Sequence, residues 1–171
     1  MDTVPDYVEP LEAWRVWRVG MHDGRLALFS AYAHAPWEPG VPLSATCAKP
    51  HRSVRRPWRM EASDHHAPDL GCSCGIYGVR SLAAARWFLE SHAFASRADH
   101  VIGRVALWGD VVVSQWGWRA SVAYPLELFV PAATPLGHWR RSRLELDETL
   151  DALETYRVPV DVLQPDAVLA A

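Results

Sequence analysis

The sequence predicts a single α+β domain, in which a strongly curved or closed antiparallel β-sheet packs against one helix and a second helix follows near the C-terminus. Three observations lead to this fold class. Of the 171 residues, 50% are hydrophobic, which supplies one substantial core in a chain that is short for two domains. Short apolar segments separated by tight turns occupy residues 101–130. Two other segments have the periodicity of amphipathic helices.

The N-terminal part is predicted to hold an irregular arm and then a β-hairpin. Two prolines limit regular structure over residues 1–13. Bulky apolar and basic residues alternate imperfectly over 14–19, a turn follows at 20–24, and a second apolar run covers 25–30. This order of strand, turn and strand favours an antiparallel hairpin.

Residues 36–71 are predicted to form a long loop outside the sheet. They are rich in proline, histidine and arginine and have almost no periodicity. Loops of this length are uncommon in a compact domain, and those that occur tend to be functional, disordered or held by a ligand. This region is therefore the most informative part of the chain.

A strand and a helix are predicted to follow this loop. Residues 74–79 form a short apolar run that is typical of a buried strand. Ser81 is placed to cap a helix that continues to about His92, with its apolar residues on the face that would cover a sheet.

The next segment predicts a three-stranded meander. Its apolar strands cover residues 101–108, 111–115 and 118–124, and Gly109-Asp110 and Trp116-Gly117 separate them. Two-residue connections that contain glycine are typical of tight hairpin turns.

The C-terminal part is predicted to hold the second helix, a closing strand and a loose tail. The helix starts near Asp147, because leucines recur on one face and acidic residues on the other. Residues 158–160 are expected to close the sheet, and residues 161–171 are expected to form the tail. The whole chain, residues 1–171, is interpreted as one domain.

The composition limits the classes of function. Seventeen basic and twenty acidic residues give a formal charge of −3, which argues against affinity that depends on a wholly basic surface and leaves room for a local basic patch. No apolar run approaches the roughly 20 residues that span a bilayer, and the acidic N-terminus is unlike a signal peptide. A cytoplasmic protein is therefore expected.

All three cysteines of the chain lie near the predicted long loop, with three histidines between them. A zinc ion takes four nitrogen or sulfur ligands, so three cysteines and one histidine would supply a closed structural site. His66 is the preferred histidine because it comes just before the turn that leads into Cys72. The predicted zinc ligands are Cys47, His66, Cys72 and Cys74. The Cys-x-Cys spacing is tighter than usual, so three ordinary thiols or a redox-active thiol stay open as alternatives.

Two groups of basic and aromatic residues predict a ligand surface. Most of the nine tryptophans are expected in the core, but basic residues interleaved with an aromatic residue are suited to contact phosphate and stack a base. The first group is Arg52, Arg55, Arg56 and Trp58. The second group is Trp116, Trp118 and Arg119. The alternatives are a solvated, mobile loop for the first group and an arginine stacked on a tryptophan for the second.

Several motifs cover most of the chain. They are Trp37 with Pro39, Cys47, His66 with Pro68, Cys72-Ser73-Cys74-Gly75-Ile76-Tyr77, residues 101–109, Gly117-Trp118-Arg119-Ala120 and residues 156–160. Together they resemble a family of uncharacterised actinobacterial proteins. The resemblance implies no activity, because no function is established for that family.

The order of the strand at 74–79, the helix at 81–92 and the strand at 101–107 is similar to that of the ASCH and PUA-like β-barrels. Such folds often bind RNA or modified nucleosides, so the similarity implies this class of ligand by analogy of fold. ASCH-type amidohydrolases use a lysine in their site, whereas Lys49 matches no such motif. The similarity therefore implies no catalytic residue here.

The predicted function is non-catalytic binding of nucleic acid or of a nucleotide-like ligand, with the zinc site holding the loop that carries the basic residues. The chain has no recognisable Ser-His-Asp order, glycine-rich phosphate loop or His-Glu-x-x-His motif. Two other classes stay open. One is a small zinc- or thiol-dependent enzyme, and the other is a protein–protein interaction module that uses the surplus tryptophans.

Overall fold

The computed structural model of the protein describes residues 9–31, 35–53, 56–62, 65–93, 99–131 and 146–163. Strands dominate this part of the chain and two helices complete the α+β fold, as the sequence predicts. The first elements are β1 (Leu11–His22), β2 (Arg25–Ser30), β3 (Pro36–Trp37), β4 (Leu43–Ser44), β5 (Ala48–Ser53), β6 (Arg56–Ala62) and β7 (Ile76–Val79). The others are α1 (Leu82–Ala93), β8 (Asp99–Ser114), β9 (Gly117–Pro131), α2 (Leu146–Glu154) and β10 (Val160–Leu163).

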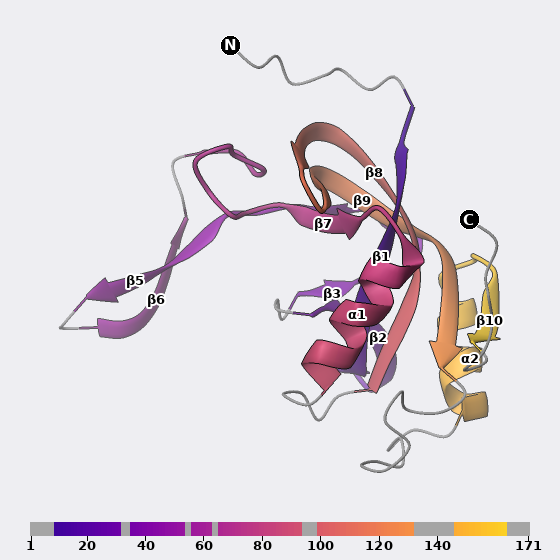
Figure 1. Ribbon diagram of the computed structural model, residues 1–171. Helices are drawn as coiled ribbons and strands as arrows, with labels where there is room; N and C mark the ends of the chain where they lie inside the picture. Colours follow the sequence, from indigo (N-terminus) through magenta and orange to yellow (C-terminus); the bar gives the residue numbers. More distant parts are fainter. Residues whose placement is uncertain are drawn as a thin grey trace.

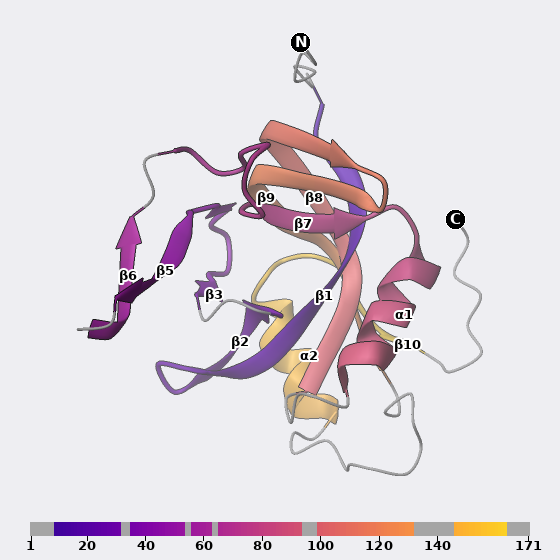
Figure 2. The same cartoon turned by 60° about the vertical axis from the view of Figure 1, so that its left-hand side comes forward.

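The main sheet bends into a partial ring (Figures 1 and 2). β8 pairs with β1 on one side and with β9 on the other, and β9 also pairs with β7. β7 returns to β1 through a single residue pair, Trp14 with Val79. These pairings are antiparallel, whereas β10 joins β9 in parallel. The curved antiparallel sheet of the prediction is present, with one parallel strand added.

The predicted three-stranded meander is wrong, because β8 and β9 form one long hairpin. β8 runs through Gly109 and Asp110 without reversing, and its register against β9 shifts at this point. Gly109 has a φ of +75°, and the Asp110 N–H donates to Ser121 Oγ on the facing strand at 2.9 Å. A β-bulge and a hairpin turn both use glycine at positive φ, so the sequence pattern does not separate them.

The predicted loop over residues 36–71 contains four strands and is therefore corrected. β3 and β4 extend the main sheet, whereas β5 and β6 form a separate two-stranded sheet that projects away from it (Figure 1). Each strand of this hairpin carries a proline, Pro50 or Pro57. Proline has no N–H to donate to a neighbouring strand, so it is rare in central strands and tolerated in edge strands. The segment leaves the main sheet as predicted, but it does so as a hairpin.

The regular structure extends into the arm and the tail that were predicted to lack it. β1 begins at Leu11, inside the predicted arm over residues 1–13. β10 reaches Leu163, inside the predicted tail over residues 161–171, and pairs with four residues of β9. Both segments pair with strands that are distant in the sequence, and this pairing satisfies their backbone N–H and C=O groups. The segments alone therefore do not predict it.

Both predicted helices are present, and each covers a different part of the core. Ser81 caps α1, because its Oγ accepts a hydrogen bond from the Ala84 N–H at 3.2 Å. α1 places Ala85 and Leu89 in a smaller apolar cluster with β1, β8 and β9. Leu153 of α2 belongs to the larger cluster, on the opposite face of β1.

The segment after α2 is held against β2 and β3 by packing in the larger cluster and by hydrogen bonds of Tyr156. Trp17 and Trp37 are fully buried and pack edge to face, with ring centroids 5.6 Å apart. The Tyr156 hydroxyl accepts a hydrogen bond from the Leu28 N–H at 2.9 Å and donates one to the Trp37 carbonyl. Burial raises the pKa of Tyr156 to about 12. Trp17 and Trp37 are therefore structural, as expected. The expectation that most tryptophans lie in the core is not met by the others whose side chains are described, because Trp14, Trp108 and Trp118 are only partly buried and Trp87 and Trp116 are exposed.

Candidate metal centre

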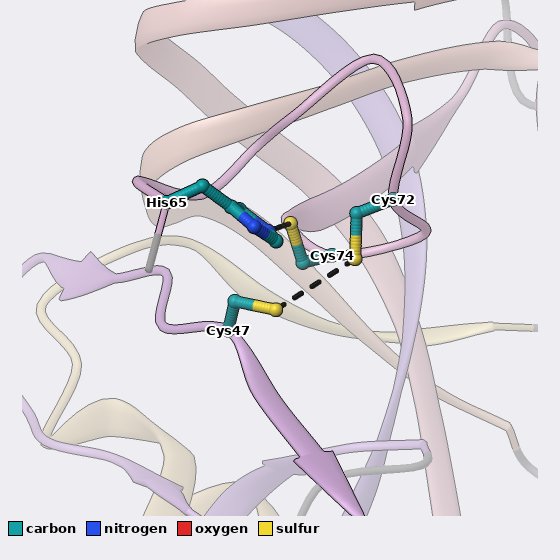
Figure 3. Close-up of side chains that lie close together, drawn as sticks. All are labelled: Cys47, His65, Cys72 and Cys74. Atoms are coloured by element: carbon teal, nitrogen blue, oxygen red, sulfur yellow. Dashed lines mark hydrogen bonds between the residues drawn. The ribbon is translucent and has the colours of Figure 1, made fainter. Parts of the chain in front are cut away.

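Four potential metal ligands meet where the β5–β6 hairpin joins the main sheet. Cys47, His65, Cys72 and Cys74 each offer one ligand atom, and these four atoms lie within 4.8 Å of one another (Figure 3). Cys47 Sγ lies 3.7 Å from Cys72 Sγ, and His65 Nε2 lies 3.4 Å from Cys74 Sγ. All four side chains are partly buried. The three cysteines of the predicted zinc site are thus together.

Two of the separations match the edges of a tetrahedral zinc site, and none of the others exceeds 4.8 Å. With Zn–S bonds of about 2.3 Å and Zn–N bonds of about 2.0 Å, the edges of the tetrahedron are about 3.8 Å between sulfurs and about 3.5 Å between sulfur and nitrogen. The observed 3.7 Å and 3.4 Å agree with these edges. The four atoms can therefore surround one ion after small movements of their side chains.

The ligands come from three segments that the fold brings together. Cys47 directly precedes β5, and His65 follows the end of β6 by three residues. The pair Ala48–Ala62 closes the hairpin between them. Cys72 and Cys74 lie in the loop that leads into β7 of the main sheet. A metal ion held here would join both ends of the hairpin to the sheet.

A compact loop makes the short Cys-x-Cys spacing workable. The Cys72 N–H donates to the Asp69 carbonyl at 3.2 Å, and the Gly71 N–H donates to the Asp69 carboxylate at 2.8 Å, so a tight turn precedes the cysteines. Gly75 has a φ of +115°, and a Cβ there would lie only 2.9 Å from the Pro68 Cβ. Only glycine fits this position.

The two cysteines of the loop have different acidities. A hydrogen bond from the backbone of Cys74 is the main cause that lowers the pKa of the Cys72 thiol to about 7. Burial raises the pKa of the Cys74 thiol above its usual value. The thiolate is the form that binds metal, so an ion held here would keep both thiols deprotonated.

Arg119 holds the loop in place from β9. Its guanidinium donates hydrogen bonds to the carbonyls of Asp69, Cys72 and Cys74, at 3.3 Å for Asp69 and 2.8 Å for Cys74. The same group lies 5.9 Å from the ring centroid of Tyr77. Arg119 was predicted as a ligand-binding residue, but its guanidinium donates its hydrogen bonds to the loop that carries Cys72 and Cys74.

Replacing Arg119 with methionine is expected to weaken zinc binding about 10- to 100-fold, because the carbonyls that orient the two cysteines lose their shared donor. Competition with a chromophoric chelator measures this affinity. Arg80→Met is the matched control, since Arg80 lies 4.5 Å from the Trp118 ring centroid and donates to the Ser114 carbonyl, outside the loop. Equal affinities of the two variants for zinc would contradict a positioning role for Arg119.

The histidine of the cluster is His65, so the choice of His66 is corrected. His66 is exposed, whereas His65 is partly buried with its Nε2 toward the sulfur of Cys74. Neighbouring residues of a chain that is not helical point in different directions, so only one of two adjacent histidines faces the cluster. The sequence offers no signal that separates the two.

The other predicted ligand residues lie apart from this cluster. Trp118 is covered by the guanidinium of Arg80 and not by that of Arg119, so the stacking alternative holds only with an arginine from outside the group. Trp116 is 73% exposed at the turn between β8 and β9. The backbones of the remaining residues are placed on the β5–β6 hairpin, except for that of Arg55, which lies outside the described residues. They are Arg52 on β5 and Arg56 and Trp58 on β6.

Comparison with known proteins adds no relative. No family model, no curated protein and no solved structure matches this chain. Among the described residues, neither helix is long and apolar enough to cross a membrane. The candidate site is therefore defined by the geometry of its own residues.

Proposed function

We propose that the chain is a non-catalytic binding protein in which one structural zinc ion fixes a basic hairpin, and that this hairpin contacts nucleic acid. The observation that carries the proposal is the place where the four ligands meet. Cys47 and His65 lie just outside the two ends of the β5–β6 hairpin, and Cys72 and Cys74 belong to the loop before β7.

The ligand set favours zinc in a structural role. Three sulfurs and one imidazole suit a borderline-soft ion such as Zn²⁺, whereas Mg²⁺ and Ca²⁺ take oxygen ligands. Four protein ligands fill a tetrahedral site and leave no position for a reacting water. A reducing compartment such as the cytoplasm would keep the three thiols available, so the proposal includes a cytoplasmic location.

The charge of the hairpin supports an anionic partner. Residues 48–62 hold five basic residues and a single acidic one, Glu61, in a chain whose net charge is −3. Trp58 lies among these basic residues, a combination that suits phosphate contacts and base stacking. A nucleic acid therefore fits this segment better than a small uncharged ligand.

Replacing Arg52 and Arg56 together with alanine is expected to weaken binding to a labelled single-stranded RNA about ten-fold or more. Loss of two phosphate contacts also reduces the slope of log affinity against log salt by about 1.4. Fluorescence anisotropy between about 50 and 200 mM salt measures both quantities.

Arg25→Ala is the control for this double variant, because Arg25 is exposed at the start of β2 and belongs to the main sheet. The control is expected to bind RNA as the unmodified protein does. If the unmodified protein shows no binding at the lowest salt concentration, or if the double variant binds as tightly as the control, the hairpin is not a nucleic-acid surface.

A further inference from the structure

The strands on one side of β1 separate from each other and leave a fork. β1 pairs with β8 along one edge, from Leu11 to Val19. On its other edge it pairs with β7 only at Trp14 and with β2 from Trp17 onward. In Figures 1 and 2, β7 and β2 leave β1 in different directions. Arg15 lies at this point, between the two pairings.

Arg15 belongs to the row of β1 residues that faces the larger core. Residues two apart on a strand share a face, and the others in this row, Ala13, Trp17 and Val19, are between 0% and 5% exposed. The Arg15 guanidinium spans the fork, since Nη1 donates to the Tyr77 carbonyl at the β7 side and Nη2 donates to Ser30 Oγ at the β2 side, the latter at 2.9 Å.

The positive charge of Arg15 has no carboxylate partner in the described part of the chain. The ion pairs of that part involve His22 and Arg104 instead. Burial lowers the pKa of Arg15 to about 10. The Arg15 side chain is partly buried. An inward-facing charge with reduced access to water is normally paired, because an unpaired charge removed from water is costly.

Two N–H groups beside this charge also lack an acceptor. Nε of Arg15 and Nε1 of Trp17 are buried, and neither has a hydrogen-bond partner among the described residues. The two side chains are neighbours on the same face of β1, with the Arg15 guanidinium 5.9 Å from the Trp17 ring centroid and 5.2 Å from that of Trp37. Ordered water would satisfy the N–H groups but would not neutralise the guanidinium.

We propose that the fork between β2 and β7 binds a small oxyanion, the carboxylate or phosphate group of a ligand, with Arg15 as its charge partner. The unpaired N–H groups of Arg15 and Trp17 donate to its oxygens. Charge-assisted hydrogen bonds, such as those from a guanidinium to an oxyanion, are the strong ones. Neither Arg15 nor Trp17 is a candidate metal ligand, and both lie on β1, outside the β5–β6 hairpin.

The test uses the indole N–H resonances of the full-length, metal-loaded protein, titrated with inorganic phosphate and, separately, with acetate at constant ionic strength. A saturable shift of the Trp17 indole N–H with at least one of these anions is the expected result. A response to phosphate alone identifies a phosphate site, and a response to acetate alone identifies a carboxylate site. If neither anion shifts this resonance, the proposal is wrong, and this result needs no variant.

Arg15→Met is expected to weaken the binding of the active anion about ten-fold or more, as fits the loss of a charge-assisted hydrogen bond. Arg25→Met serves as the matched control, because it also removes one positive charge but from an exposed position at the start of β2. Undiminished affinity in Arg15→Met would mean that the anion binds elsewhere, and the proposed site would be abandoned.

Discussion

Replacing His65 with alanine is expected to reduce the zinc content of the purified protein from about one ion per chain to a small fraction of that, whereas His66→Ala leaves it unchanged. The reason is geometric. His65 Nε2 lies 3.4 Å from Cys74 Sγ, inside the group of four ligand atoms, and His66 is exposed outside it. The two variants remove the same side chain from neighbouring positions, so each is the control for the other.

Elemental analysis measures the zinc content, and thiol titration reports the state of the cysteines. In the unmodified protein and in His66→Ala, the three thiols are expected to react only after a chelator removes the metal. In His65→Ala they react without it. Full zinc content in His65→Ala, or a metal-free native protein with three freely titrating thiols, would exclude this metal centre.

The local elements of the fold could be predicted wherever the sequence carries its own signal. Ser81 caps α1 as expected, since a serine before an amphipathic run satisfies the free N–H groups at a helix start. At Gly109 the same reasoning gave the wrong element. A glycine at positive φ serves both a turn and a bulge, and the choice depends on Ser121 of the facing strand, which contacts Asp110.

The candidate site could be predicted by composition but not in its details. Three cysteines in one region of the sequence indicate a cluster, and Cys47, Cys72 and Cys74 are indeed together. The choice between His65 and His66 depends on the direction of a side chain in a turn. The role of Arg119 depends on the pairing of β9 with β7, which brings residues about 50 positions apart into contact. Tertiary structure decides both.

The β5–β6 hairpin could not be predicted from its own sequence. Its prolines and high charge favour a loop by every local rule, and among the described strands it pairs with none of the main sheet. An isolated two-stranded hairpin is marginally stable in water. The hairpin therefore needs support from outside its own sequence, and the metal ligands at its base are the feature that can supply it.

Removal of the metal is expected to unfold the hairpin while the main sheet stays folded. Amide hydrogen exchange over residues 48–62 should accelerate about 100-fold or more after chelation, which corresponds to loss of roughly 3 kcal/mol of local stability. Amides of β8 and β9 should keep their protection, because their core residues, such as Val105 and Leu128, are fully buried and independent of the metal.

Removal of the metal is also expected to weaken RNA binding about ten-fold or more. An unfolded basic segment must become ordered when it binds, and the free-energy cost of this ordering lowers its affinity for RNA. His65→Ala should reproduce both changes without a chelator, and His66→Ala should show neither. Unchanged exchange in the hairpin after zinc loss would mean that contacts other than the metal hold it. Faster exchange with unchanged RNA affinity would separate the two parts of the proposal, leaving the metal as a structural tie and placing the RNA surface elsewhere.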